Sequence, residues 1–138
     1  MEIAPLSPTA VSAAVELWER AGLTRPWNDP VADLQRALAG PASTVLAGWA
    51  DGDLLATAMV GHDGHRGSVY YLAVSPEHQG RGHGRSMMAA CEAWLRERGV
   101  PKLNIMVRGD NSTARGFYER LDYGTDDVMV LSRRLDAA

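Results

Sequence analysis

The N-terminal third of the chain has the hydrophobic spacing of α-helices. After a short expected strand at residues 3–6, apolar residues recur every three or four positions in two runs. Ser7-Pro8 and Asp29-Pro30 precede these runs, and each pair combines a helix N-cap with proline at the first helical position. The runs, with the glycines that follow them, are Val11–Trp18 with Gly22 and Val31–Leu38 with Gly40. The pattern predicts two helices joined by a loop over residues 23–29.

The middle of the chain changes to the pattern of β-strands. Apolar runs at residues 43–50 and 53–61 flank Asp51-Gly52, which is a strong signal for a tight hairpin. A polar, glycine-rich stretch at residues 62–67 predicts a loop. Residues 68–74 form an apolar run that we expect to be the central strand of the sheet.

The C-terminal half returns to alternating helices and strands. A helix is predicted over residues 85–98, followed by a strand at 102–107, a helix that begins at Asn111 and a last strand at 128–135. The core-facing residues of the first of these helices are Met87, Met88, Cys91, Trp94 and Leu95. A helix between two neighbouring strands makes them parallel, whereas hairpins make antiparallel pairs. The fold class is therefore α/β, with a mixed, mostly antiparallel sheet and one parallel pair.

Composition narrows the class of protein. The chain has 138 residues, 46% of them hydrophobic and 22% charged, which suits a single globular domain over residues 1–138. The net charge of −3, without long basic runs, argues against a nucleic-acid partner. One cysteine, Cys91, excludes an internal disulfide, and its place on an apolar helix face favours packing over chemistry. We expect a cytoplasmic protein with no membrane span and no metal site.

The stretch from Gln79 to Arg85 has the sequence of an anion site. It joins an apolar strand to an amphipathic helix and contains Gly80, Gly82 and Gly84. Glycines let the backbone approach a ligand closely, and helix N-termini attract phosphate. The chain has no Gly-Lys pair, so this is no P-loop, and the glycine spacing differs from the G-x-G-x-x-G of dinucleotide sites. The competing interpretation is an ordinary loop with solvated arginines.

Two motifs together resemble a known family. Gln79-Gly80-Arg81-Gly82-His83-Gly84 matches the Q/R-x-x-G-x-G/A signature of the GNAT superfamily of acyl-CoA-dependent N-acetyltransferases. Residues 111–118, Asn-Ser-Thr-Ala-Arg-Gly-Phe-Tyr, resemble the N-x-x-A-x-x-F-Y helix of that family. Arg25-Pro26-Trp27-Asn28-Asp29-Pro30 with Asp63 to Ser68 also resembles the small bacterial YpeA-type branch. The resemblance covers nearly the whole chain and implies helices on both faces of the sheet.

The resemblance implies acetyl-CoA as cosubstrate and direct transfer of its acetyl group to a primary amine. By this resemblance Tyr118 is the general acid that protonates the departing thiolate, although Tyr118 also suits a packing role. Pantetheine pairs with the edge of the strand at residues 72–74, near which a backbone N–H stabilises the oxyanion. Asn111 contacts the same arm or caps its helix, or does both. The implied cosubstrate-binding residues are Leu72, Ala73, Val74, Gln79, Gly80, Arg81, Gly82, His83, Gly84, Arg85, Asn111 and Ala114.

The catalytic base is where the chain departs from the family pattern. Many relatives carry a glutamate at the position of Met106, and residues 68–74 contain no carboxylate. The base candidates are His62, Asp63, His65, Glu19 and Asp29. The candidate acceptor-binding residues are Trp27, Asn28, Asp29, His62 and Tyr70. A small molecule or a peptide α-amine is the favoured acceptor, in a monomer or homodimer. Two alternatives stay open: an acyl-CoA sensor without catalysis, and an unrelated nucleotide-binding domain.

Overall fold

A computed structural model describes residues 1–136 of the chain, which fall into two compact units. The first unit, Met1–Met106, holds the sheet and three of the helices, and the second begins at Val107. The single domain over residues 1–138 stays a prediction. Within residues 1–136 no helix is both long and apolar enough to cross a bilayer.

The elements of the first unit follow the predicted order. Both N-terminal helices are confirmed: Ser7 caps a short 3-10 turn, η1, that leads into α1, and the Asp29 carboxylate accepts from Ala32 N–H (3.1 Å) at the start of α2. Asp51 and Gly52 have φ of 52° and 82°, as the predicted hairpin turn requires. The elements are β1 (Glu2–Pro5), η1 (Pro8–Ala10), α1 (Val11–Arg20), α2 (Pro30–Ala39), β2 (Ser43–Ala50), β3 (Asp53–His62), β4 (Gly67–Val74), η2 (Pro76–His78), α3 (His83–Glu97) and β5 (Leu103–Asn104).

The sheet is mixed, as predicted, with the strand order β1-β2-β3-β4-β5. The first four strands pair antiparallel, and β5 pairs parallel to β4. The expectation that residues 68–74 form the central strand is wrong, because β3 occupies the middle and β4 lies beside it. The strand predicted over residues 102–107 is shortened to two residues, because β5 pairs only with the first two residues of β4.

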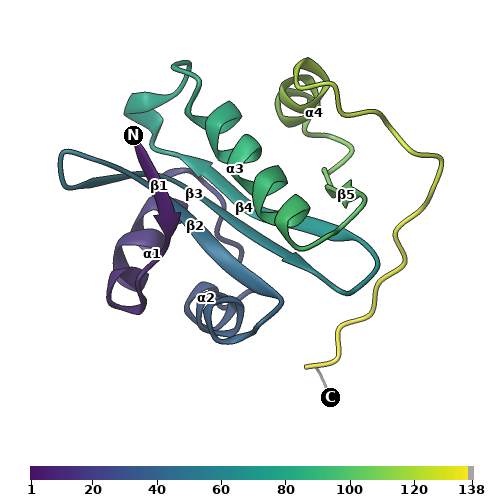
Figure 1. Ribbon diagram of the computed structural model, residues 1–138, viewed down its shortest axis with the longest axis horizontal. Helices are drawn as coiled ribbons and strands as arrows, with labels where there is room; N and C mark the ends of the chain where they lie inside the picture. Colours follow the sequence, from purple (N-terminus) through teal and green to yellow (C-terminus); the bar gives the residue numbers. More distant parts are fainter. Residues whose placement is uncertain (137–138) are drawn as a thin grey trace. The chain divides into compact units, whose positions relative to one another are not determined.

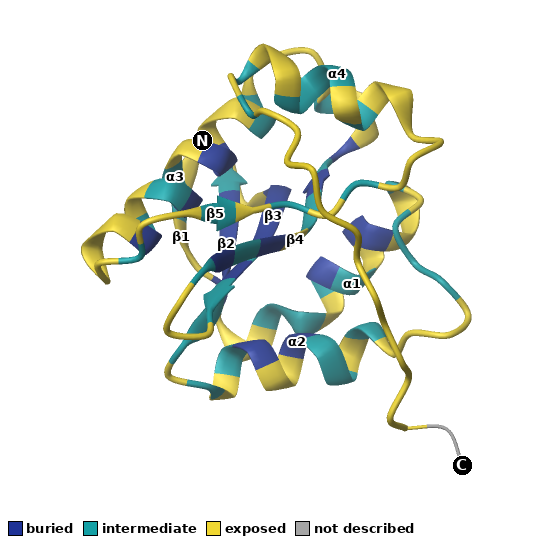
Figure 2. Ribbon diagram, turned by 90° about the vertical axis from the view of Figure 1, so that its right-hand side faces the viewer, coloured by how far each residue is buried: buried dark blue, intermediate teal, exposed yellow. Residues whose placement is uncertain are grey.

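Helices cover both faces of this sheet (Figure 1). On one face, Leu17 and Trp18 of α1 and Leu34 of α2 are fully buried against the strands. On the other face, α3 buries Met87, Met88, Cys91 and Leu95, and Figure 2 shows buried positions concentrated on the strands between the helices. Two apolar residues of the predicted helices lie farther out: Val31, the first residue of the second apolar run, is 41% exposed, and Trp94, expected in the core, is only half-buried, with the Arg98 guanidinium 3.7 Å from its ring centroid.

Cys91 is buried in α3, and burial raises its pKa from 9.0 to about 12. Because the thiolate is the reactive form, we expect an aromatic disulfide reagent at pH 8 to label Cys91 only after denaturation.

The Cys91 thiol loses its proton from about pH 9 in the unfolded chain and from about pH 12 in the folded chain, so the free energy of unfolding should fall between those pH values. Cys91→Ala should weaken that alkaline dependence. Rapid labelling of the native protein would contradict both expectations.

The second unit contains α4 (Ser112–Arg120) and a C-terminal segment. The expected helix start is confirmed, because the Asn111 carboxamide oxygen accepts from Ala114 N–H (3.0 Å) as an N-cap. The strand predicted over residues 128–135 is wrong: the structure gives this segment no strand, and Val128, Met129 and Leu131 are 76–89% exposed. A strand is stabilised by its partner and by burial of one face, and apolar composition alone supplies neither.

Candidate active site

The edge of β4 that faces β5 is open over most of its length. β5 pairs with β4 only at Gly67–Leu103 and Ser68–Asn104. Within residues 1–136, no strand pairs with residues 69–74 on that side, while β3 pairs with β4 on the other. An unpaired edge presents backbone N–H and C=O groups in a row. An extended ligand with amide groups can add to such an edge as a further strand.

A bulge in β4 turns specific amides toward this open edge. Gly67 N–H donates to Lys102 O on the β5 side (2.8 Å), whereas Ser75 N–H donates to Leu55 O on the β3 side (2.7 Å). Successive N–H groups of a strand alternate sides, so residues 67 and 75, an even number apart, would point the same way in a regular strand. One extra residue therefore lies between them, where the register with β3 shifts. Beyond it the N–H groups of Leu72 and Val74 face the open edge.

The glycine loop connects the end of β4 to the start of α3. Gln79 Nε2 donates to Val74 O (3.2 Å), which ties the loop to the strand. Gly80 and Gly82 have φ of +79° and +83°, a region that side chains disfavour, and a Cβ on either would meet no atom within 4 Å. Gly82 is the N-cap of α3 and supplies no side chain to its first turn. The N–H groups at the start of this 15-residue helix are thus open to an anion.

The charges around the loop suit a phosphate. Arg81 and Arg85 are exposed, and His83 lies in the first turn of α3, next to Gly84. Glu77, two residues before Gln79 in the sequence, accepts from the Ser75 hydroxyl and lies 3.5 Å from Arg20 Nη1. The hydrogen bond from Ser75 and the charge of Arg20 lower the Glu77 pKa. The positive charge of Arg20, the last residue of α1, therefore offsets the negative charge of Glu77.

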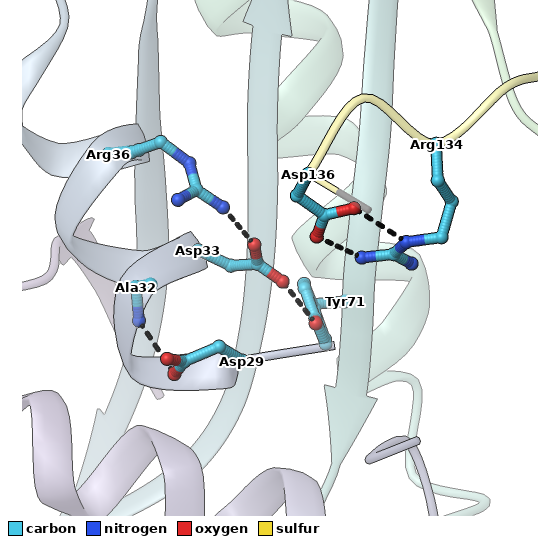
Figure 3. Close-up of polar contacts among 7 residues, drawn as sticks. All are labelled: Asp29, Ala32, Asp33, Arg36, Tyr71, Arg134 and Asp136. Atoms are coloured by element: carbon cyan, nitrogen blue, oxygen red, sulfur yellow. Dashed lines mark hydrogen bonds and ion pairs between the residues drawn. The ribbon is translucent and has the colours of Figure 1, made fainter. Parts of the chain in front are cut away.

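The candidate acceptor residues before α2 lie in a turn. Arg25 Nη1 donates to Gly22 O and Thr24 O (both 2.9 Å), and Asn28 N–H closes the turn onto Arg25 O (3.1 Å). Trp27 is 52% exposed. The Asp29 carboxylate is engaged as the cap of α2 (Figure 3). This carboxylate serves the helix start, which weakens its case as the catalytic base.

The base candidates on the loop before β4 are engaged in local contacts. Asp63 Oδ1 accepts from the N–H groups of Arg66 and His65 (2.9 Å each), and these bonds lower the Asp63 pKa. His62 Nδ1 accepts from Gly64 N–H (3.3 Å). Asp63 therefore stays ionised as a turn-forming group and is a weak proton acceptor. Glu19, His65 and Tyr70 are exposed, and Tyr70 lies on β4 itself.

Sequence reasoning missed three residues that surround the bulge. Trp18, Thr57 and Asp33 all contact Tyr71, which has a positive φ of 51°. They come from α1, β3 and α2, so no local motif connects them. The adjacent tyrosines Tyr70 and Tyr71 gave no signal of the bulge, because neighbouring residues of a regular strand already point to opposite faces.

The second unit carries the other predicted site residues. Asn111 caps α4, Ala114 is partly buried in its first turn, and Tyr118 is half-buried two turns from the cap. The Tyr118 ring packs edge-on against Phe117 and Tyr123, with centroids 5.0 and 5.8 Å apart. The structure thus brings the β4 edge and the glycine loop together in the first unit, and Asn111, Ala114 and Tyr118 together in the second.

Comparisons with known proteins agree with these features. A model of the acetyltransferase (GNAT) family matches residues 12–123. An acetyltransferase of Yersinia pestis strain Pestoides F is 44% identical over 135 residues, 98% of this chain and 96% of the relative. An acetyltransferase of Pectobacterium atrosepticum is 42% identical over the same shares.

Solved structures share the fold. The aminoglycoside N-acetyltransferase AAC(6')-Iy, solved with a bisubstrate analog of CoA and acetylneamine, superposes with a TM-score of 0.83 at 15% identity, covering 96% of this chain and 97% of that one. The ribosomal-protein-S18-alanine N-acetyltransferase of Escherichia coli gives 0.75 at 27% identity, covering 87% and 75%. The family match over most of the length, together with the whole-chain relatives, decides the assignment: the chain belongs to the GNAT family of acetyltransferases.

Proposed function

We propose that this acyl-CoA-dependent N-acetyltransferase moves the acetyl group of acetyl-CoA to the amine of a small molecule or a peptide, with an α-amine favoured. The observation that carries the proposal is the open β4 edge directly followed by the glycine loop and the uncapped start of α3. The loop N–H groups, with Arg81 and Arg85, hold the pyrophosphate, and the β4 edge pairs with the amides of pantetheine.

The proposed reaction uses these residues together with Tyr118, whose role the family resemblance implies. A neutral amine attacks the thioester carbon, and a tetrahedral oxyanion forms. The Val74 N–H, turned outward by the bulge, donates to that oxyanion. The C–S bond then breaks, Tyr118 gives its phenolic proton to the thiolate, and the amine proton passes to a base or to water. A phenol and a thiolate have comparable basicity, so this transfer needs little extra driving force.

A relative supports the preference for an α-amine. The Escherichia coli enzyme is, by its name, an alanine N-acetyltransferase that acts on a ribosomal protein, and alanine offers no side-chain amine. The aminoglycoside enzymes are under 20% identical to this chain, so they inform on the fold and not on the acceptor. The α-amine is therefore the acceptor class to test first.

Acetyl-CoA should raise the melting temperature of the protein. A ligand that binds only the folded state adds about 2.7 kcal/mol at a concentration about 100 times its Kd. Gly82→Val should abolish the shift, since a branched side chain resists the φ of +83° and occupies the space for the phosphate. The measurement is thermal unfolding with and without acetyl-CoA.

Gly99→Val is the matched control. Gly99 has φ of +72° and open surroundings, but it follows the opposite end of α3. Both variants should lose stability through backbone strain, and only Gly82→Val should lose the ligand shift. If Gly82→Val does not fold, Gly82→Ala provides the same comparison with less bulk. A wild-type melting temperature that does not change with saturating acetyl-CoA would refute the proposal.

A further inference from the structure

Tyr71 is the residue that makes the bulge in β4. Ala73 pairs with Thr57 and Tyr70 pairs with Met59, so Tyr71 and Leu72 together oppose Ala58. The two faces of the strand exchange at this point. A Cβ on Gly67 would meet Leu95 of α3, whereas Ala73, six residues on, belongs to the core under α1 and α2. Tyr71 absorbs the change with φ of 51°, which a tyrosine rarely adopts.

Three contacts hold Tyr71 in this conformation, and a fourth, between Trp18 and Thr57, supports them. The Thr57 hydroxyl donates to Tyr71 O (3.1 Å) and accepts from Trp18 Nε1 (2.8 Å). The rings of Trp18 and Tyr71 stack with centroids 3.7 Å apart and planes 5° from parallel. The Tyr71 hydroxyl donates to Asp33 Oδ2 (2.7 Å), as Figure 3 shows. A residue in a strained conformation persists only where its surroundings determine it, and here both backbone and ring are fixed.

The bond between Tyr71 and Asp33 lies beside a buried, fully hydrogen-bonded pair. Trp18 and Thr57 are fully buried, and they satisfy each other's polar groups. The Asp33 side chain is about one quarter exposed and also pairs with Arg36 one turn later on α2. Burial and the neighbouring Asp33 carboxylate raise the Tyr71 pKa, so the phenol stays protonated and remains a donor. The phenol–carboxylate bond therefore connects α2 to the bulge across the working pH range of an enzyme.

We propose that Asp33, acting through Tyr71, is a positioning residue for acyl transfer. The Asp33–Tyr71 bond and the Trp18 stack hold the bulge, and the bulge directs the N–H groups of Leu72 and Val74 to the open edge. This inference rests on the proposed function, in which those amides meet the thioester. Asp33 itself touches no reacting atom. Its removal lets the bulge relax, and misaligned donors stabilise the oxyanion less well.

The test compares Tyr71→Phe, Asp33→Ala and the double variant. Each single variant should lower kcat about 10- to 100-fold, as expected for misplacement on the scale of an ångström. The Kd for acetyl-CoA should change less than about threefold, because the glycine loop still holds the phosphates. The double variant should be no slower than the slower single variant, since both remove one bond. Asp33→Asn keeps an acceptor oxygen and should restore most of kcat.

The matched control is Asp53→Asn, which removes an exposed carboxylate at the start of β3 and should leave kcat unchanged. Hydrogen exchange gives a second readout that needs no turnover: the amide of Ala73, which pairs with Thr57 of β3 next to the bulge, should exchange faster in Tyr71→Phe than in wild type. Reduced melting temperatures with wild-type kcat and wild-type exchange would overturn the inference and leave Tyr71 as a packing residue. Wild type that releases no CoA with any amine would instead refute the proposed function, and the exchange result would still decide the role of Asp33.

Discussion

Replacing Tyr118 with phenylalanine should lower kcat about ten- to ten-thousandfold, the range for loss of a general acid, with little change in the Kd for acetyl-CoA. The change removes only the phenolic proton donor. The ring keeps its edge-on contacts with Phe117 and Tyr123, so α4 should remain folded. Steady-state kinetics with release of the CoA thiol measures kcat, and calorimetry measures the Kd.

Tyr123→Phe is the control for Tyr118→Phe. It removes a hydroxyl from the neighbouring ring in the same unit, 5.8 Å away between centroids, while the Tyr118 phenol stays. We expect kcat within about twofold of wild type, because no proton is transferred from this position. Equal kcat in Tyr118→Phe and wild type would show that Tyr118 only packs, and the thiolate would then leave without an acid from α4.

The parts of the fold that local chemistry determines were predictable. The caps Ser7, Asp29 and Asn111 mark helix starts because their side chains satisfy N–H groups a few residues away. The Asp51-Gly52 turn fixes the β2–β3 hairpin through its own φ values. Each signal acts over two to four residues, so the sequence expresses it directly.

The parts that depend on a partner were not predictable. Residues 128–135 have strand composition, yet they have no strand partner in the described chain, and β5 pairs with β4 at two positions only. The same limit applies to the site. The glycine loop is local and could be predicted, whereas the bond from Tyr71 to Asp33 spans 38 residues. A bulge depends on the register between strands, which the pattern of one strand does not contain.

The acceptor amine should be one of low pKa, such as an α-amine, and not a lysine-type amine. By the family resemblance we expect a glutamate at the position of Met106, and β4 carries no carboxylate. In the described chain, the Asp29 and Asp63 carboxylates are occupied as a helix cap and as a turn acceptor. Of the carboxylate candidates only the exposed Glu19 is then left, and we expect the amine to lose its proton with help from His62, His65 or water.

The cost of that proton decides between acceptor classes. Deprotonating a lysine side chain, with a pKa near 10.4, costs about 4 kcal/mol at pH 7.4, whereas deprotonating an α-amine with a pKa near 8 costs less than about 1 kcal/mol. The difference of about 3 kcal/mol predicts kcat/KM at neutral pH about 100- to 300-fold higher for the α-amine. Acceptors matched in size and differing in amine pKa, assayed from about pH 6.5 to 9.5, test this expectation. The preference should shrink as pH rises, because lysine-type amines then gain neutral form while α-amines are already neutral. A preference for lysine-type amines at neutral pH would mean that a base acts at the β4 edge after all.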